Sequence, residues 1–263
     1  MSGSDPILPL IVTVLLAPIV LSYYWNISLV ALIAKQCRCC CQPKHLVTTS
    51  TFNLIDAIAI AKNTTNIFGS RTIRLIHVRG SQTLTTEPIV IDFGPLTIQG
   101  ESTDVIATHG ISIVGGAEVH IKHLRIHGNT FSDNIMDGKG ISILDRHSLL
   151  HLSACVVENC HSSGIVARRG GSFILESCHI RSNHGSGIVV GDSISNGNIK
   201  NCHIKSNVNS GVYVYHGGTC TVHGESTEIE KNQVDLRARG GTIELYVDEL
   251  SCTRRVEENG MIV

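Results

Sequence analysis

Apolar residues recur at every second position in short runs between Cys155 and Val214, and glycine, serine and asparagine separate the runs. This period of two predicts short β-strands whose alternate side chains are buried. The runs contain no helical pattern long enough for a leucine-rich or helical repeat. The pattern therefore predicts strands that are joined by turns rather than by helices.

These strands belong to a repeat. Cys155, Cys178 and Cys202 each open a similar stretch, at spacings of 23 and 24. A fixed period in the twenties is typical of a solenoid in which each coil stacks on the last. The positions that recur with these cysteines are Val157, Ile180 and Ile204; Cys160, Asn183 and Asn207; Gly164-Ile165, Gly187-Ile188 and Gly211-Val212; and Ala167, Val190 and Val214.

The same register extends towards both ends of the chain. Leu124 holds the place of Cys155 one coil earlier, and the step between them is lengthened by an insertion between Asn129 and Gly140. A still earlier coil begins at Leu96, and a coil after that of Cys202 begins at Thr227. Insertions at one corner are expected where loops grow from one face of a solenoid. We therefore predict about seven coils.

One corner of the coils carries a row of asparagines. Asparagine tolerates the left-handed backbone conformation, and its side-chain amide can hydrogen-bond to the backbone at turns. We interpret the row as a structural ladder, and Cys160, which replaces asparagine in one coil, as a local weak point. The residues in this row are Asn129, Asn183, Asn207 and Asn232.

Both ends of the coils need a cap. An amphipathic helix, capped by Ser50 or Thr51, is expected to run to about Lys62 and to bury Leu54, Ile55, Ile58 and Ala61 on one face. A first strand is expected over residues 72–78. The polar tail from residue 251 to 263 is expected to cover the open end or to fray.

The coils resemble the right-handed parallel β-helix repeats of the pectin-lyase-like superfamily. The segments "PIVIDFGPLTIQGEST" (88–103) and "TFNLIDAIAIAKN" (51–63) are similar to the entry coils and to the N-terminal capping helix of that superfamily. The resemblance covers about residues 50–248 and implies an all-β fold. It leaves function open, because the superfamily contains polysaccharide lyases as well as non-enzymatic scaffolds.

Residues 6–34 form a run of 29 without a charged side chain. As a helix it would be about 43 Å long, against roughly 30 Å of bilayer hydrocarbon, so we predict a single transmembrane anchor; a cleaved signal peptide is the alternative. Lys35, Arg38 and Lys44 follow the run, and the positive-inside rule then places the β-helix in the cytosol. The predicted domains are an anchor (1–35), a cysteine-rich linker (36–50), the β-helix with its capping helix (51–250) and the tail (251–263).

Cysteines in the linker and in the coils are expected to differ in role. Juxtamembrane thiols are common palmitoylation sites, although an unmodified linker is an alternative. The cysteines of the coils are expected to point inward as reduced core residues, and His179 and His203 then point outward. No metal site and no cofactor are predicted. The candidate lipidation sites are Cys37, Cys39, Cys40 and Cys41.

Composition narrows the range of partners. A net charge of −1 gives no electrostatic basis for nucleic-acid binding, and an aromatic content of 4% argues against a sugar-stacking groove. The resemblance implies that enzymes of the superfamily carry carboxylates on the outer face of one sheet. This chain has Ser112, Ser142, Val166, Val189 and Tyr213 at the outward positions of its Gly-Ile strand. The only candidate catalytic residues near that face are in loops, namely Asp104, His109, Asp133 and Asp137.

The outward positions suggest a binding surface instead. Val166, Val189 and Tyr213 are expected to form an exposed apolar stripe, one residue per coil, with Arg168, Arg169 and Tyr215 at its edge. The alternative is that a loop or the tail covers the stripe. The predicted function is a membrane-tethered, non-catalytic scaffold that binds a protein or a glycan. The alternative function is an extracytoplasmic carbohydrate-active enzyme (a lyase, hydrolase or epimerase).

Overall fold

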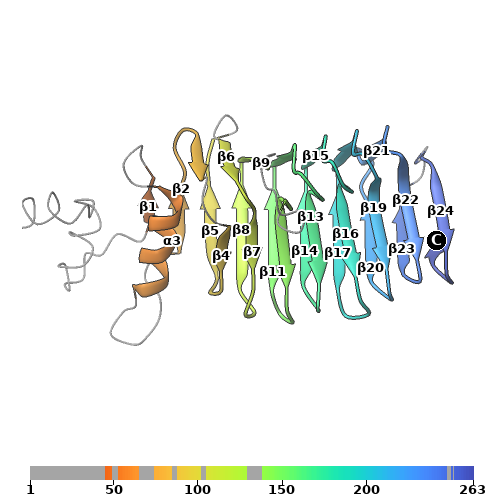
Figure 1. The fold of residues 1–263 in the computed structure, drawn as a ribbon, viewed down its shortest axis with the longest axis horizontal. Coiled ribbons are helices and arrows are strands. Elements are labelled where there is room, and N and C mark those ends of the chain that lie inside the picture. The colour runs from red at the N-terminus through yellow and green to blue at the C-terminus, as the bar shows by residue number, and fades with distance from the viewer. Residues whose placement is uncertain are drawn as a thin grey trace, which may run out of the picture.

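The structure, a computed structural model, describes residues 45–48, 53–64, 74–84, 88–101, 105–128, 138–247, 250 and 252–263. In this part of the chain, short strands stack along one long axis, and helix α3 lies at the N-terminal end of the stack (Figure 1). All strand pairs between neighbouring coils are parallel, as in Arg181 opposite Lys205 and Val189 opposite Tyr213. The predicted all-β solenoid is confirmed.

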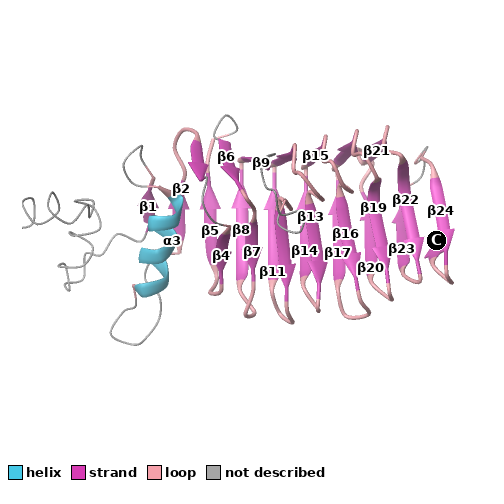
Figure 2. Cartoon of the chain, viewed as in Figure 1, coloured by secondary structure: helices cyan, strands magenta, loops and turns pink. Residues whose placement is uncertain are grey.

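Each complete turn contributes one strand to each of three sheets (Figure 2). The first sheet has ten strands in the order of the chain. These are β1 (His45–Val47), β2 (Leu75–His77), β5 (Leu96–Gln99), β8 (Glu118–Lys122), β11 (Leu149–Ser153), β14 (Ser172–Glu176), β17 (Asn196–Lys200), β20 (Thr219–His223), β23 (Thr242–Tyr246) and β25 (Met261–Ile262).

The second and third sheets follow along each turn. The seven-stranded sheet contains β3 (Gln82–Leu84), β6 (Val105–Thr108), β9 (Arg125–Gly128), β12 (Val156–Glu158), β15 (His179–Arg181), β18 (His203–Lys205) and β21 (Glu228–Glu230). The eight-stranded sheet contains β4 (Ile89–Ile91), β7 (Ile111–Ile113), β10 (Ile141–Leu144), β13 (Ile165–Arg168), β16 (Ile188–Gly191), β19 (Ser210–Tyr215), β22 (Val234–Arg239) and β24 (Arg254–Glu257). The three-strand order repeats seven times from β2 to β22, as the sequence predicts.

The register of the coils follows the sequence repeat. Ile180 lies opposite Ile204, and Ile188 lies opposite Ile165 and Val212. All five side chains are fully buried in one continuous apolar core. Since each coil has only a few inward positions, the core consists of rows of like residues rather than of an irregular cluster.

The cysteines of the coils extend these rows. Cys155, Cys178 and Cys202 are at most 1% exposed and belong to the core. Burial raises the pKa of the Cys155 thiol to about 12, and it does the same for Cys220. Cys155 and Cys220 therefore stay protonated near neutral pH. The burial of these cysteines confirms their interpretation as small apolar core residues.

Helix α3 (Leu54–Asn63) closes the N-terminal end of the stack. Its N-cap is Asn53, whose side chain accepts a hydrogen bond from the Asp56 amide at 3.0 Å. The prediction of a cap at Ser50 or Thr51 was therefore wrong, because Asn53 already accepts the bond that a cap provides. The helix buries Leu54, Ala57, Ile58 and Ala61, whereas Ile55, which was expected on the same face, is 38% exposed.

The C-terminal residues continue the sheets. Strand β24 pairs with β22 and strand β25 pairs with β23, so residues 252–263 add an incomplete eighth turn. Of the two expectations for the tail, the structure therefore supports the one that it covers the open end, and it does so by pairing as strands rather than by fraying. Polar side chains sufficed for pairing here because the bonds that hold the last strands are between backbone groups, such as the Leu236 amide and the Thr253 carbonyl at 2.9 Å.

The predicted anchor (6–34) and the four linker cysteines (37–41) lie outside the described residues. Among the residues that are described, no helix is both long enough and apolar enough to cross a membrane. The C-terminal end of the predicted linker is not a linker, since β1 pairs with β2 ahead of the capping helix.

Replacement of Ile188 by Asp should disrupt the stack. The side chain is fully buried between Ile165 and Val212, and a carboxylate there would have no partner. The expected loss in the free energy of unfolding is at least about 3 kcal/mol, measured by urea denaturation. Val208→Asp, at a position that is 58% exposed, is the matched control and should cost little. Equal stability of the two variants would contradict the register.

Candidate functional site

The outer face of the eight-stranded sheet carries two rows of side chains. They start from the Gly-Ile corner and alternate with the buried core positions along each strand. The first row consists of Val90, Ser112, Ser142, Val166, Val189, Tyr213, Arg237 and Arg255. The second row contains Leu144, Arg168, Gly191, Tyr215, Arg239 and Glu257.

The two valines of the predicted stripe are not exposed. Val166 is 2% exposed and Val189 is 5% exposed, although neither belongs to the apolar core. The prediction that these two valines form an accessible stripe was wrong. A short side chain in the row loses surface to neighbours about 4.8 Å away on both sides, whereas Val90, on the edge strand β4, is 54% exposed.

Beyond the two buried valines, the first row becomes accessible again at Tyr213. Its ring is half-buried and stacks against that of Tyr215, with 5.2 Å between centroids and 21° between planes. The Arg237 guanidinium lies over the Tyr213 ring at 5.0 Å, and Arg168 lies over the Tyr215 ring at 5.6 Å. The two tyrosines and the two arginines thus form one contiguous cluster, which we call the tyrosine–arginine cluster.

Glycine at position 191 makes room for this arrangement. Gly191 lies opposite Tyr215 in the second row, and a Cβ atom there would overlap with the Tyr215 ring. The absence of a side chain lets the ring lie flat on the neighbouring strand. Burial raises the pKa of the Tyr215 hydroxyl, and the charge of Arg168 offsets part of this rise.

Acidic residues of the last turn neutralise one side of the cluster. Glu257 Oε2 accepts a hydrogen bond from Arg237 at 2.9 Å, and Glu258 Oε1 accepts one from Arg239 at 2.6 Å. These bonds lower the pKa of Glu257 and of Glu258. Both carboxylates therefore stay ionised near neutral pH and are poorly suited to act as general acids.

The other edge of the cluster is basic. Arg168 and Arg169 are both exposed, and within the described chain no carboxylate forms an ion pair with either guanidinium. Arg169 has a left-handed backbone (φ 55°), and its amide donates a hydrogen bond to the Asp192 carboxylate. Tyr215 and, through it, Arg168 are thus in contact with the Tyr213 ring, and the exposed Arg169 follows Arg168 at the end of β13.

The candidate catalytic residues are not brought together by the described structure. Asp104, Asp133 and Asp137 lie outside the described residues. His109 is half-buried in the short connection between β6 and β7. Their catalytic role, which belongs to the alternative function, stays a prediction.

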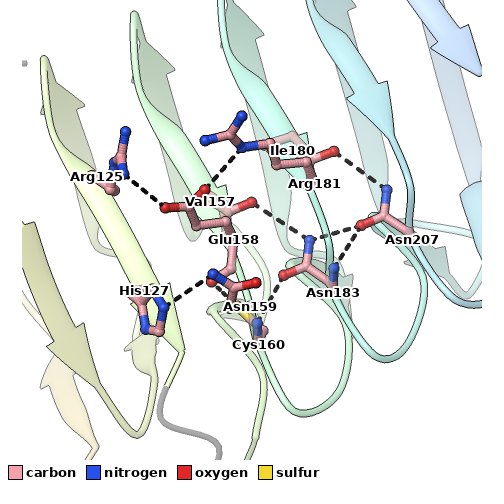
Figure 3. A network of polar contacts seen from close by, with 10 residues as sticks. All are labelled: Arg125, His127, Val157, Glu158, Asn159, Cys160, Ile180, Arg181, Asn183 and Asn207. Carbon is pink, nitrogen blue, oxygen red and sulfur yellow. Dashed lines mark hydrogen bonds and ion pairs between the residues drawn. The ribbon is translucent and has the colours of Figure 1, made fainter.

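The seven-stranded sheet carries a buried carboxylate that the sequence analysis did not single out. Glu158 is 6% exposed and lies between Arg125, at 3.2 Å, and Arg181, at 2.8 Å (Figure 3). Its position could have been read from the coil register, because Glu158 aligns with His127 and Arg181 in neighbouring strands. Both carboxylate oxygens are satisfied, so we interpret this group as structural.

The asparagine ladder runs beside it (Figure 3). Asn207 Oδ1 accepts bonds from the Asn183 amide at 3.1 Å and from Asn183 Nδ2 at 2.9 Å, and Asn232 repeats the pattern with Asn207. The ladder ends at Asp235, which accepts from Asn232 at 2.9 Å and from the Thr253 amide at 2.9 Å. The predicted hydrogen-bonded row is confirmed for its described members.

The predicted left-handed conformation of the asparagines was wrong. The residue with positive φ is the one before each ladder position, namely Asn159, Ser182, Ser206 and Lys231, with φ between 54° and 58°. The corner therefore turns one residue earlier, which leaves each ladder amide free to point inward along the stack.

The ten-stranded sheet brings together three chemically active side chains that the sequence analysis missed. Each of Glu118, His120 and His151 offers one ligand atom, and the three atoms all lie within 4.8 Å of one another. His120 and His151 are as far apart in the sequence as Leu124 and Cys155, which hold the same place in two successive coils. The repeat therefore already aligns the two histidines. The signal was therefore present in the sequence, but only once the register was applied to the outward positions.

Residues 75–248 match the family model described as right handed beta helix region. Because the match covers more than half of the chain, the protein belongs to the right-handed β-helix family. Neither a curated protein nor a solved structure gave a significant match to the chain. The family fixes the fold and its hand, and it is compatible with a scaffold as well as with a carbohydrate-active protein.

The ladder predicts opposite effects of two substitutions. Asn207→Leu removes the acceptor of the Asn183 amide and the donor to the Ile180 carbonyl, and should cost roughly 2–4 kcal/mol. Cys160→Asn extends the ladder by one rung, since Asn183 Oδ1 already accepts from the Cys160 amide at 3.0 Å.

The side chain at position 160 has about as much space beside the neighbouring glycine as the ladder residue Asn183 has. A Cβ at Gly140 would lie 2.7 Å from Cys160 Sγ, and one at Gly164 would lie 2.9 Å from Asn183 Nδ2. Thermal and urea denaturation should therefore show Cys160→Asn to be as stable as the natural protein or more so. A loss of stability comparable to that of Asn207→Leu would show that position 160 does not accept a ladder amide.

Proposed function

We propose that this β-helix protein is a membrane-tethered, non-catalytic scaffold that binds a protein partner through the tyrosine–arginine cluster. The observation that carries the proposal is the cluster itself, two stacked tyrosines flanked by arginines on the outer face of the eight-stranded sheet. Tyrosine and arginine are the residues most enriched at the energetic centres of protein interfaces.

The state of the ring faces favours a protein over a glycan. Sugars stack on open aromatic faces, whereas Tyr213 and Tyr215 are stacked against each other and covered by Arg237 and Arg168. What the cluster presents is ring edges, hydroxyl groups and guanidinium groups. With Arg168 and Arg169 at its edge, it fits a partner that offers acidic side chains around an apolar contact.

The electrostatics of the face support a non-catalytic role. Glu257, the carboxylate in its two rows, is held ionised by Arg237. The other members of the rows are aliphatic, hydroxylic, aromatic or arginine side chains, which do not titrate near neutral pH. A carbohydrate-active enzyme would depend on Asp104, Asp133 and Asp137 around His109.

The tether is proposed from the sequence. The uncharged run of residues 6–34 is long enough to span a bilayer, and the basic residues that follow it support a cytosolic β-helix. Palmitoylation of Cys37, Cys39, Cys40 and Cys41 would add a second membrane anchor beside the first.

Loss of the two tyrosines should abolish binding. A random peptide library displayed on phage, selected on the full-length protein in detergent, is expected to yield acidic peptides with an apolar residue. Their affinities for the Tyr213→Ala/Tyr215→Ala protein, measured by calorimetry, should fall at least about tenfold, because interface tyrosines commonly contribute about 1.4 kcal/mol or more.

The control for this experiment is Tyr246→Ala. Tyr246 is 68% exposed on the ten-stranded sheet, so its loss removes a surface tyrosine far from the cluster. Undiminished affinity of the double variant, with an unchanged melting temperature, would contradict the proposed surface. Cleavage of an oligosaccharide from a panel of neutral and acidic glycans would favour the enzyme instead.

Topology can be tested separately. Protease added to sealed right-side-out vesicles should leave residues 50–263 intact, and deletion of residues 6–34 should release the protein from the membrane. Fragment sizes on immunoblots measure both effects. Glycosylation at Asn63, which lies in an Asn-Thr-Thr sequence, would place the β-helix on the opposite side and contradict the proposed orientation.

A further inference from the structure

We infer that Glu118, His120 and His151 form a binding site for a zinc-type divalent cation on the outer face of the ten-stranded sheet. This sheet is distinct from the eight-stranded sheet that carries the tyrosine–arginine cluster. The inference is therefore independent of the proposed function.

The coil register builds the site. Glu118 and His120 are two residues apart on β8, so both side chains point outward from the same face. His151 on β11 lies directly opposite His120 in the next coil. The chain thus places a carboxylate and two imidazoles side by side without any loop, on strands that are fixed on both sides by backbone pairing.

The distances are close to those of a metal site. Glu118 Oε1 lies 2.9 Å from His120 Nε2, and the rings of His120 and His151 stack with centroids 4.3 Å apart and planes 5° apart. Two ligands of a tetrahedral zinc ion, each bonded at about 2.0–2.1 Å, are separated by roughly 3.3 Å. The lone pair of each ring nitrogen lies in the plane of its ring, so the two parallel rings must also tilt towards the ion, and the partial exposure of all three groups allows these rotations.

The donor set selects the class of ion. Two imidazole nitrogens and one carboxylate oxygen suit zinc and related transition metals, whereas calcium and magnesium prefer oxygen ligands. Three protein ligands leave at least one coordination position for water or for a group of another molecule. The site is thus an open one on a surface rather than a closed structural one.

The ligand groups are accessible from solvent. The side chain of His120 is 28% exposed and that of Glu118 is 45% exposed, so an ion can reach both.

The chain contains a second group with the same composition. His179 and His203 stack with ring centroids 4.8 Å apart, and Glu228 Oε2 lies 2.8 Å from His203 Nδ1. Within the described residues, however, only Glu118, His120 and His151 bring three ligand atoms within 4.8 Å of one another. The pair His179 and His203 is therefore a matched control for residue type and stacking.

The test is a titration of the full-length, tag-free protein in detergent with Zn²⁺, followed by calorimetry and by competition with a chelating dye. Cys37, Cys39, Cys40 and Cys41 are replaced by Ser in every sample, because thiolates bind zinc. One Zn²⁺ per chain should bind in the parent protein. His120→Ala and His151→Ala should each weaken the affinity at least tenfold, since even indirect partners of a zinc ligand contribute about 10–100-fold.

Co²⁺ gives an independent readout, because its visible absorption reports nitrogen and oxygen ligation. The spectrum should appear in the parent protein and in His179→Ala/His203→Ala, and should be lost in His120→Ala/His151→Ala with no change in melting temperature of the metal-free protein. Absence of binding in the parent, or equal affinity in His120→Ala/His151→Ala, would overturn the inference. Loss of binding in the His179→Ala/His203→Ala control alone would do the same.

Discussion

The pairing of each coil with the next is the interaction on which the rest of the structure depends. A strand in this fold has no partner within its own turn, so its amide and carbonyl groups are satisfied only by the turns above and below it. This requirement fixes the register, and a fixed register places equivalent residues about 4.8 Å apart. Core residues then stack on like residues, as Ile180 does on Ile204, and a substitution in one turn is felt by the turns beside it.

The same constraint explains how the ends and corners are built. An end turn would leave a row of unpaired backbone groups, and here helix α3 closes one end while β24 and β25 add a partial turn at the other. Corners repeat a left-handed residue, because the chain must turn at the same place in each coil. Side-chain amides then form hydrogen bonds between successive corners, as backbone groups do between successive strands. This row runs from Asn183 through Asn207 and Asn232 to Asp235.

Much of the fold could be predicted from the sequence because the register is a local, periodic property of the chain. The inward residues, the seven turns and the buried cysteines all follow from the spacing of the repeat. The burial of outward residues could not be predicted from the repeat, because it depends on the size of the side chains at equivalent positions in neighbouring coils. Val189 and Tyr213 occupy equivalent positions, yet the valine is buried and the tyrosine is only half-buried. The last strands were missed for a related reason, since backbone pairing holds polar residues that show no apolar period.

Function in such a fold is expected where a row stops being uniform. An outward row of paired side chains only completes the surface, as the Arg125–Glu158–Arg181 row does. Tyr213 ends a run of serines and valines in the first row, and Gly191 leaves the space that the ring of Tyr215, on the neighbouring strand, needs. His120 and His151 are flanked by a threonine and an isoleucine in their own outward row. Because the backbone holds every row at the same spacing, each of these departures converts a repeat position into a defined arrangement of chemical groups, without any change in the fold that carries it.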